Sequence, residues 1–360
     1  MRVIHAINVA AAVGVLAVLA FQESSGGEAE PGQGSAVSVP ERQKGVCLVG
    51  GRKRPTDGAL DKVSALGVNW ISQTPFGWQR RHDDPELRMA TGGRVWWGES
   101  DEGLVDTARR AQERGMQTVL KPHIWIRDRD NGKWRGEIDF DTDADWDTWW
   151  ERYRTFALHY ARLAEQSEMA VYCIGTELRS SVLKRPERWR ELIAEIRTVY
   201  SGSLTYSANW YREFEEVPFW DALDYIGLQA YFPLAEGASD EIGLEVLLAG
   251  WAAHLKKIER VQLKYGKPVL LTEVGYRSTQ DAATEPWRWR SDADPDNALQ
   301  ARCYEAMFRT FWDKGWLAGL YIWKWYPDDR MTNRRRHGFT PQGKPAEQVL
   351  REWYLGDDEP

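Results

Sequence analysis

Cysteine is scarce in this sequence, and its spacing excludes two common kinds of cross-link. The 360 residues include only three cysteines, at positions 47, 173 and 303. Their number is odd and no two show the C-x-x-C spacing, so neither a disulfide framework nor a structural zinc site is predicted. Cys47 and Cys173 lie inside apolar runs, where a buried free thiol acts as a small hydrophobic side chain.

An excess of positive charge is also missing. The chain has 47 Lys and Arg against 54 Asp and Glu, a net charge of −7, and the two signs are mixed along its length. Because the binding of nucleic acid phosphates requires a basic face, we expect no nucleic acid partner. The local exception is the run of three arginines at 334–336, which we interpret as a solvated loop.

Several motifs of metal and cofactor chemistry are absent as well. The sequence has no H-E-x-x-H motif, no H-x-H on its first strand, no Gly-rich phosphate loop after a strand and no G-x-S-x-G elbow. The acidic segment 128–147 does not follow the order of an EF-hand calcium loop. We therefore expect neither a metal ion nor an organic cofactor.

The first 42 residues differ from the rest of the chain. Residues 1–21 carry Arg2, an apolar run at 7–20 and a possible cleavage site at 18–20, which is the plan of a secretory signal peptide. A retained membrane anchor is the alternative, although the run is short for a spanning helix. Residues 22–42 are rich in Gly, Ser, Glu and Pro and predict a disordered linker. We expect a secreted or periplasmic protein.

From residue 43 to the end, strand-like and helix-like segments alternate without a second break in composition. This order predicts one (β/α)8 barrel over 43–360. The expected strands are 45–49, 68–74, 117–125, 171–178, 203–208, 225–230, 269–272 and 317–325. The expected helices are 57–66, 102–114, 146–166, 187–200, 243–265, 297–314 and 344–354. Polar segments at 75–100 and 127–144 are predicted to be loops on the working face.

Two of the expected strands end in the same way, with an apolar run that stops at a glutamate. These are Glu177 on the fourth strand and Glu273 on the seventh. Simple alternation places each glutamate on the same face as the residues two and four positions before it. In parallel barrels the reactive groups lie at the carboxyl ends of the strands. Two carboxylates there can hydrolyse a glycosidic bond, since one protonates the leaving oxygen and the other attacks or activates water.

Other polar side chains are expected around the same mouth. Lys121 and His123 are two positions apart on the third strand, so they share a face and can bind sugar hydroxyls or hold a glutamate ionised. Tyr231 follows the sixth strand, where its phenol can donate to the nucleophile, and Asn209 ends the fifth. The alternatives are a structural ion pair for the first two and packing for Tyr231.

Aromatic residues are abundant, with 20 Trp, 14 Tyr and 10 Phe. Their faces stack on the apolar faces of sugars, but they also fill cores. Trp323, at the end of the eighth strand, is a candidate floor for a sugar ring, with barrel packing as the alternative. The tryptophans of the polar segments are further candidate sugar platforms; they are Trp78, Trp96, Trp97 and Trp134.

Several short motifs, in their order and spacing, resemble glycoside hydrolase family 113. They are Lys-Pro-His-Ile-Trp at 121–125, Trp-Arg-Gly-Glu-Ile at 134–138, Asp-Trp at 145–146, Gly-Thr-Glu-Leu at 175–178, Thr-Glu-Val-Gly-Tyr at 272–276 and Gly-Phe-Thr-Pro-Gln-Gly-Lys-Pro at 338–345. The resemblance covers about residues 43–355. That family belongs to clan A of the retaining (β/α)8 glycosidases, and its known activity is β-1,4-mannanase.

The resemblance implies roles for the two glutamates. Glu177 would be the general acid/base and Glu273 the nucleophile of a double displacement, with carboxyl groups about 5 Å apart. One position departs from the clan. Clan A usually has Asn directly before the acid/base, where it contacts the sugar 2-hydroxyl, whereas this chain has Thr176. A shorter hydroxyl there leaves the identity of the sugar more open than the reaction.

We therefore expect an exported retaining β-glycoside hydrolase, most simply an endo-β-1,4-mannanase. Its partner would be a polysaccharide or oligosaccharide substrate. Membrane contact is expected only through an uncleaved N-terminal segment, and the protein is expected to be a monomer. Three alternatives stay open: hydrolysis of another β-linked polysaccharide, transglycosylation by the same glutamates, and a non-catalytic barrel that only binds carbohydrate.

Overall fold

The computed structural model describes residues 41–89, 95–128, 132–237, 242–327 and 337–356. The predicted signal segment, nearly all of the predicted linker and the arginine run at 334–336 lie outside these described residues. Within the described ranges, no helix is both long enough and apolar enough to cross a membrane.

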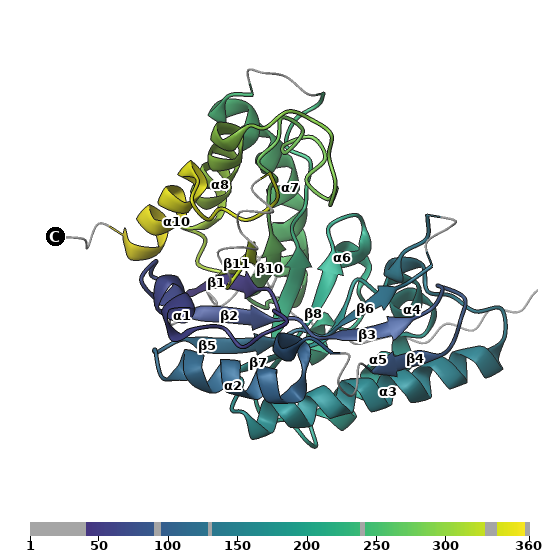
Figure 1. The fold of residues 1–360 in the computed structure, drawn as a ribbon. Coiled ribbons are helices and arrows are strands. Elements are labelled where there is room, and N and C mark those ends of the chain that lie inside the picture. Colours follow the sequence, from purple (N-terminus) through teal and green to yellow (C-terminus); the bar gives the residue numbers. More distant parts are fainter. Residues whose placement is uncertain (1–40, 90–94, 129–131, 238–241, 328–336, 357–360) are drawn as a thin grey trace, which may run out of the picture. The chain divides into compact units, whose positions relative to one another are not determined.

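Eight parallel strands close into a barrel, which confirms the predicted fold class (Figure 1). Around the barrel the strands follow the order β1-β11-β10-β9-β8-β7-β5-β2. Each barrel strand therefore pairs with the barrel strands that precede and follow it in the sequence, and the first pairs with the last. Their bounds are β1 (Gln43–Leu48), β2 (Trp70–Gln73), β5 (Gln117–Leu120), β7 (Val171–Thr176), β8 (Ser203–Asn209), β9 (Tyr225–Gln229), β10 (Val269–Val274) and β11 (Leu317–Trp325).

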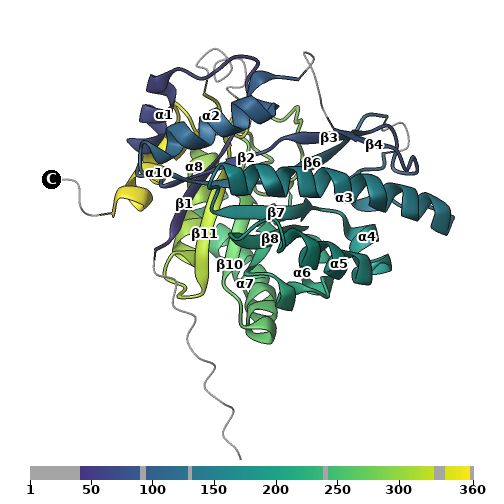
Figure 2. The same ribbon diagram turned by 90° about the horizontal axis from the view of Figure 1, so that it is seen from below.

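Helices connect and cover these strands. The α-helices are α1 (Asp57–Ser64), α2 (Asp101–Gln112), α3 (Asp143–Gln166), α4 (Arg179–Lys184), α5 (Pro186–Ile196), α6 (Glu213–Glu216), α7 (Leu244–Tyr265), α8 (Asn297–Phe311) and α10 (Pro345–Leu355). Short 3-10 turns are η1 (Trp97–Glu99), η2 (Arg135–Glu137) and η3 (Trp220–Ala222). Helix α8 packs against both α7 and α10, whereas α3 lies against β7 (Figures 1 and 2).

Local sequence accounts for several helix ends. The side chain of Ser100 accepts a hydrogen bond from the backbone N–H of Gly103 and caps α2, and Asp296 caps α8 through Leu299. Helix α7 ends at Gly266, whose φ of 61° is left-handed and suits glycine. These caps and the glycine lie within two residues of the boundaries predicted from the sequence.

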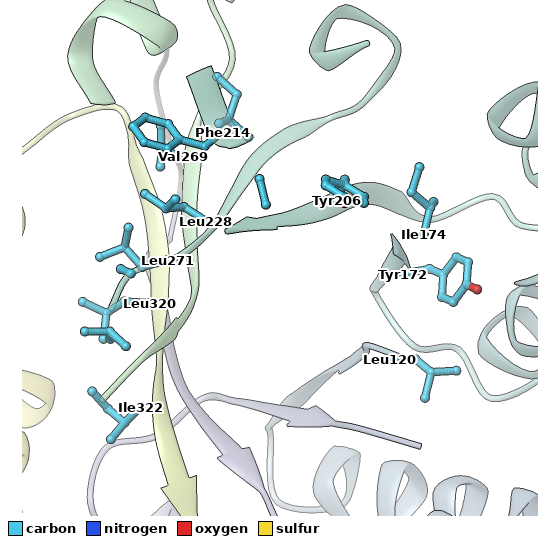
Figure 3. Packing of buried hydrophobic residues seen from close by; sticks show 14 of the residues in the cluster. Leu120, Tyr172, Ile174, Tyr206, Phe214, Leu228, Val269, Leu271, Leu320 and Ile322 are labelled. Carbon is cyan, nitrogen blue, oxygen red and sulfur yellow. The ribbon is translucent and has the colours of Figure 1, made fainter. Parts of the chain in front are cut away.

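The apolar core has two parts. A small cluster consists of strand residues alone, among them Cys47, Val171 and Leu270, and it therefore fills the barrel interior. A much larger cluster joins the outer faces of the strands to the helices. Figure 3 shows part of it, with Leu271 and Leu320 projecting to the same side of their strands.

A second sheet, which the sequence analysis did not predict, extends one side of the barrel. It has the order β4-β3-β6, with β3 (Phe76–Gln79), β4 (Leu87–Met89) and β6 (His123–Ile126), and β4 lies against α3. The prediction that 75–100 is only a loop was therefore wrong. The single strand expected at 117–125 is also divided, at Pro122, which has no N–H to give to a ladder.

Candidate active site

The two glutamates occupy the places that their strand numbers predicted. Glu177 directly follows β7, the fourth barrel strand, and Glu273 lies in β10, the seventh. Their exposed fractions are 6% and 3%, and both line one cleft of about 1110 Å3. The cleft lies at the carboxyl ends of the barrel strands, where this fold places its chemistry.

Simple strand alternation does not explain how Glu273 reaches the cleft. Val269 and Leu271 pack outward in the helix-facing core, whereas Leu270 belongs to the barrel interior. The register of β10 then shifts between Leu271 and Glu273 against β9. This irregularity turns the carboxylate inward, as bulges next to active sites commonly do. The prediction that Glu273 shares a face with Val269 and Leu271 was therefore wrong.

The same correction applies to Glu177. The register of β7 shifts between Cys173 and Thr176, and a Cβ on Gly175 would meet the rings of Trp189 and Tyr206 on the helix side. Gly175 therefore does not share the face of the glutamate. Glu177 itself has a φ of 54°, which is rare for a residue other than glycine, and its N–H donates to Ser207 O at 2.9 Å.

Glu273 is surrounded by hydrogen-bond donors. Lys121 forms a close ion pair with Oε1, and the Tyr231 hydroxyl donates to Oε2 at 2.7 Å. His123 Nε2 lies 3.5 Å from Oε1. Burial, together with the positive charges of Lys121 and Arg135, holds the pKa of His123 well below its usual value, so the imidazole is neutral. Glu273 therefore has one positively charged partner, one hydroxyl donor and one neutral imidazole around its carboxyl group.

Glu177 has a different set of partners. The Arg135 guanidinium lies 3.0 Å from Oε2, and Asn209 Nδ2 donates to Oε1 at 2.7 Å. Arg135 comes from η2, in the polar segment that was expected to be a loop, and the sequence analysis did not single it out. Its signal was present, because Arg135 belongs to one of the motifs that carry the family resemblance. Each oxygen of Glu177 therefore accepts a hydrogen bond from a side chain.

The structure therefore brings together most of the predicted site residues. Trp323 and Thr176, the two still to be placed, differ in whether they reach the cleft. Trp323 lines the cleft, with the Lys121 ammonium 5.5 Å from its ring centroid. Thr176 is buried and does not line the cleft, and its hydroxyl donates to Pro122 O at 3.4 Å. Substrate contact by Thr176 stays a prediction, as do the roles of the others.

Aromatic side chains form one side of the cleft. We call Trp210, Tyr211, Trp287 and Trp289 the aromatic wall. Trp210 and Trp287 are stacked, with ring centroids 5.1 Å apart, and Trp287, Trp289 and Tyr211 are exposed by 43%, 58% and 56%. Exposed aromatic rings in a cleft are suited to stacking on sugars.

Most of the tryptophans predicted as sugar platforms do not line the cleft. Of the four expected in polar segments, only Trp134 lines the cleft; Trp78, Trp96 and Trp97 lie elsewhere. Conversely, the sequence analysis did not single out Trp287 or Trp289, which follow β10 in the chain. Nothing in the local pattern around these two residues distinguishes a cleft tryptophan from a surface one.

The chemistry available in the cleft is that of two carboxylates in unlike surroundings. In the part of the chain that the structure describes, no three His, Cys, Asp or Glu side chains cluster as metal ligands would. Glu273 has a cation and a hydroxyl as its partners, whereas Glu177 has an amide and a guanidinium. Such a pair can act as nucleophile and proton donor on one substrate.

Comparison with known proteins places this site in context. The family model described as Glycoside Hydrolase Family 113 matches residues 52–344. The structure of a β-1,4-mannanase of that family in a complex is 27% identical, with a TM-score of 0.75 over 88% of this chain and 99% of the other. The β-mannanase AaManA from Alicyclobacillus acidocaldarius, bound to ManMIm, shows the same identity and TM-score over 88% and 98%.

Two further comparisons are less specific. The endoglucanase Cel5A from Pseudomonas stutzeri is 14% identical, with a TM-score of 0.57 over 88% of this chain and 95% of the other, and it supports the fold alone. A search among curated proteins found no match.

Proposed function

This chain belongs to glycoside hydrolase family 113, and from that premise we propose that it is an endo-β-1,4-mannanase that works with retention of configuration. That it is a glycoside hydrolase follows from the family. The observation that carries the finer proposal is the unlike pairing of Glu177 and Glu273 in one cleft. The mannanases of this family that share its fold at 27% identity support the substrate.

In the proposed mechanism Glu273 is the nucleophile. One of its oxygens attacks the anomeric carbon, the bond to the leaving oxygen breaks, and Glu177 gives its proton to that oxygen. In the second step Glu177 takes a proton from water, the water oxygen attacks the same carbon, and Glu273 leaves. Lys121 and Tyr231 orient the attacking carboxyl group, since both donate to its oxygens.

The size of the cleft supports a polymeric substrate. Its volume of about 1110 Å3 exceeds the range of about 300–1,000 Å3 typical of small-molecule sites. The aromatic wall adds apolar faces beyond the two carboxylates. We therefore propose internal cleavage of a chain whose sugars occupy several positions along the cleft.

A substrate panel tests the proposal directly. Mannan, glucomannan, xylan and cellulose are incubated with the enzyme, and the product sizes are measured over time. We expect a range of manno-oligosaccharides from mannan early in the reaction, and little product from xylan or cellulose. Release of single sugars from the start would contradict endo action, and preference for another polymer would contradict the assignment to mannan.

The aromatic wall gives a prediction about chain length. Trp287→Ala should raise KM for long manno-oligosaccharides about fivefold to tenfold, because one stacking contact is lost, with little change in kcat. The effect should vanish on a short aryl glycoside that does not reach the wall. Trp96→Ala is the matched control, since Trp96 is 37% exposed but does not line the cleft. Equal changes on long and short substrates would disprove a binding role for Trp287.

Export is a separate proposal that rests on the sequence of residues 1–21. Arg2 followed by an apolar run at 7–20 supports a signal peptide, and therefore a secreted or periplasmic enzyme. N-terminal sequencing of the protein recovered outside the cytoplasm checks this. A chain that begins close to Phe21 supports cleavage, whereas an intact Met1 in a membrane fraction supports an anchor.

A further inference from the structure

A third glutamate lies behind the acid/base and is fully buried. Glu213 is the first residue of α6, beside β8, and its exposed fraction is 0% (Figure 1). Its Oε1 accepts a hydrogen bond from the Tyr206 hydroxyl at 2.6 Å, and its Oε2 accepts one from the Asn209 backbone N–H at 2.7 Å. The sequence analysis placed no element at this position.

Both partners of Glu213 lead to Glu177. The Tyr206 hydroxyl accepts a hydrogen bond from the N–H of Leu178 at 2.6 Å, and Leu178 directly follows the acid/base. The side chain of Asn209 donates to Glu177 Oε1 at 2.7 Å. One buried carboxyl group therefore holds both the backbone beside Glu177 and the amide that contacts its side chain.

The surroundings of Glu213 disfavour the ionised form of its carboxyl group. Burial raises its pKa to about 8, because water is excluded from the charged form. No Lys, Arg or His lies within ion-pair distance of it among the described residues. Glu215 and Glu216 of the same helix differ, since they pair with Arg260 and Arg179 at the surface. Burial of a carboxyl group without a cation as partner lowers the stability of the fold. Residues that lower stability in this way are expected mainly at functional sites.

Glu177 also needs support from its surroundings. Its φ of 54° is a conformation that a residue other than glycine keeps only when its neighbours hold it. The neighbours that do so are Ser207 O, which accepts its N–H, and the Tyr206 hydroxyl, which accepts the N–H of Leu178. Tyr206 in turn is oriented by its hydrogen bond to Glu213 and by packing in the core.

We propose that Glu213 is a positioning residue that sets the place and orientation of the Glu177 carboxyl through Tyr206 and Asn209. The inference rests on the proposed function, in which Glu177 is the general acid/base. Glu213 touches no part of the cleft, because it is not among the residues that line it. Its effect should therefore appear only in steps that require proton transfer by Glu177.

Two substrates separate this role from a merely structural one. Hydrolysis of manno-oligosaccharides needs protonation of the leaving oxygen. A 2,4-dinitrophenyl β-manno-oligoside does not, because its dinitrophenolate departs without a proton. For Glu213→Ala we expect kcat/KM to fall about 100-fold on the oligosaccharide, within the range of general acid catalysis, and less than about threefold on the aryl glycoside. The value of kcat/KM reports the first step, so slower hydrolysis of the intermediate does not obscure it.

Glu215→Ala is the matched control, because it removes a half-buried carboxylate from the same short helix and should change neither value. If Glu213→Ala does not fold, Tyr206→Phe gives the same test, since it keeps the ring in the core and removes only the hydroxyl that joins Glu213 to Leu178. Equal losses on both substrates in a folded variant, or no loss on either, would overturn the proposal. An inactive wild-type enzyme would instead count against the proposed function itself.

Discussion

Replacement of Glu273 with alanine should lower kcat on manno-oligosaccharides by about 10⁴-fold or more, because the covalent intermediate can no longer form. The measurement is initial-rate kinetics with the purified variant. The substitution also leaves the buried ammonium of Lys121 without its carboxylate, so some loss of stability is expected in addition. Thermal unfolding of the variant is measured alongside to confirm that it folds.

Azide distinguishes a lost nucleophile from a damaged protein. The small anion can enter the space that the side chain vacates and attack the anomeric carbon from the same face. With a 2,4-dinitrophenyl β-manno-oligoside, azide should restore part of the activity to Glu273→Ala and give the α-glycosyl azide, which has inverted configuration. Full activity of Glu273→Ala without azide, or a β-configured azide product, would remove Glu273 from the role of nucleophile.

Replacement of Glu177 with alanine should have an effect that depends on the leaving group. On manno-oligosaccharides we expect kcat/KM to fall about 10²- to 10⁴-fold, the usual contribution of a general acid. On the dinitrophenyl glycoside kcat/KM should be nearly unchanged, while kcat falls because no base activates the water. Steady-state kinetics on the two substrates measure both effects.

Azide should give Glu177→Ala a product of the opposite anomeric configuration from the product of Glu273→Ala. Glu273 is still present in Glu177→Ala, so the covalent intermediate forms and azide attacks it in the second step. The product should therefore be the β-glycosyl azide, with retained configuration. An α-configured product from Glu177→Ala would exchange the two roles, and equal losses of kcat/KM on both substrates would exclude Glu177 as the acid.

Much of the barrel could be predicted because its signals are local. Apolar runs, caps such as Ser100 and terminating glycines such as Gly266 depend on neighbours along the chain, and they located most of the helices and strands. The two site strands were recognisable for the same reason, since an apolar run that stops at Glu177 or Glu273 is a local pattern. Pro122 is a local signal for the end of a strand. The strand that follows it, β6, could not be predicted locally, because it pairs with β3.

The irregularities within the site strands could not be predicted from periodicity. Alternation assumes that every residue adds one step, whereas the register shifts before Glu177 and Glu273 add an unpaired residue. Whether a strand bulges depends on how the strands beside it pair, and those neighbours are distant in the sequence. Glu273 faces the cleft because of such a shift, whereas the backbone at Glu177 has a left-handed φ of 54°.

The sequence by itself determined the order of the elements, the closed barrel and the two carboxylates at strands four and seven. Only the tertiary structure decided which side chains surround them: Arg135 from a polar connection, Glu213 from a short helix, and Trp287 from the segment after β10. Secondary structure follows from hydrogen bonds and burial patterns repeated along the chain. The partners of a buried charge follow from packing between segments that meet only when the barrel closes.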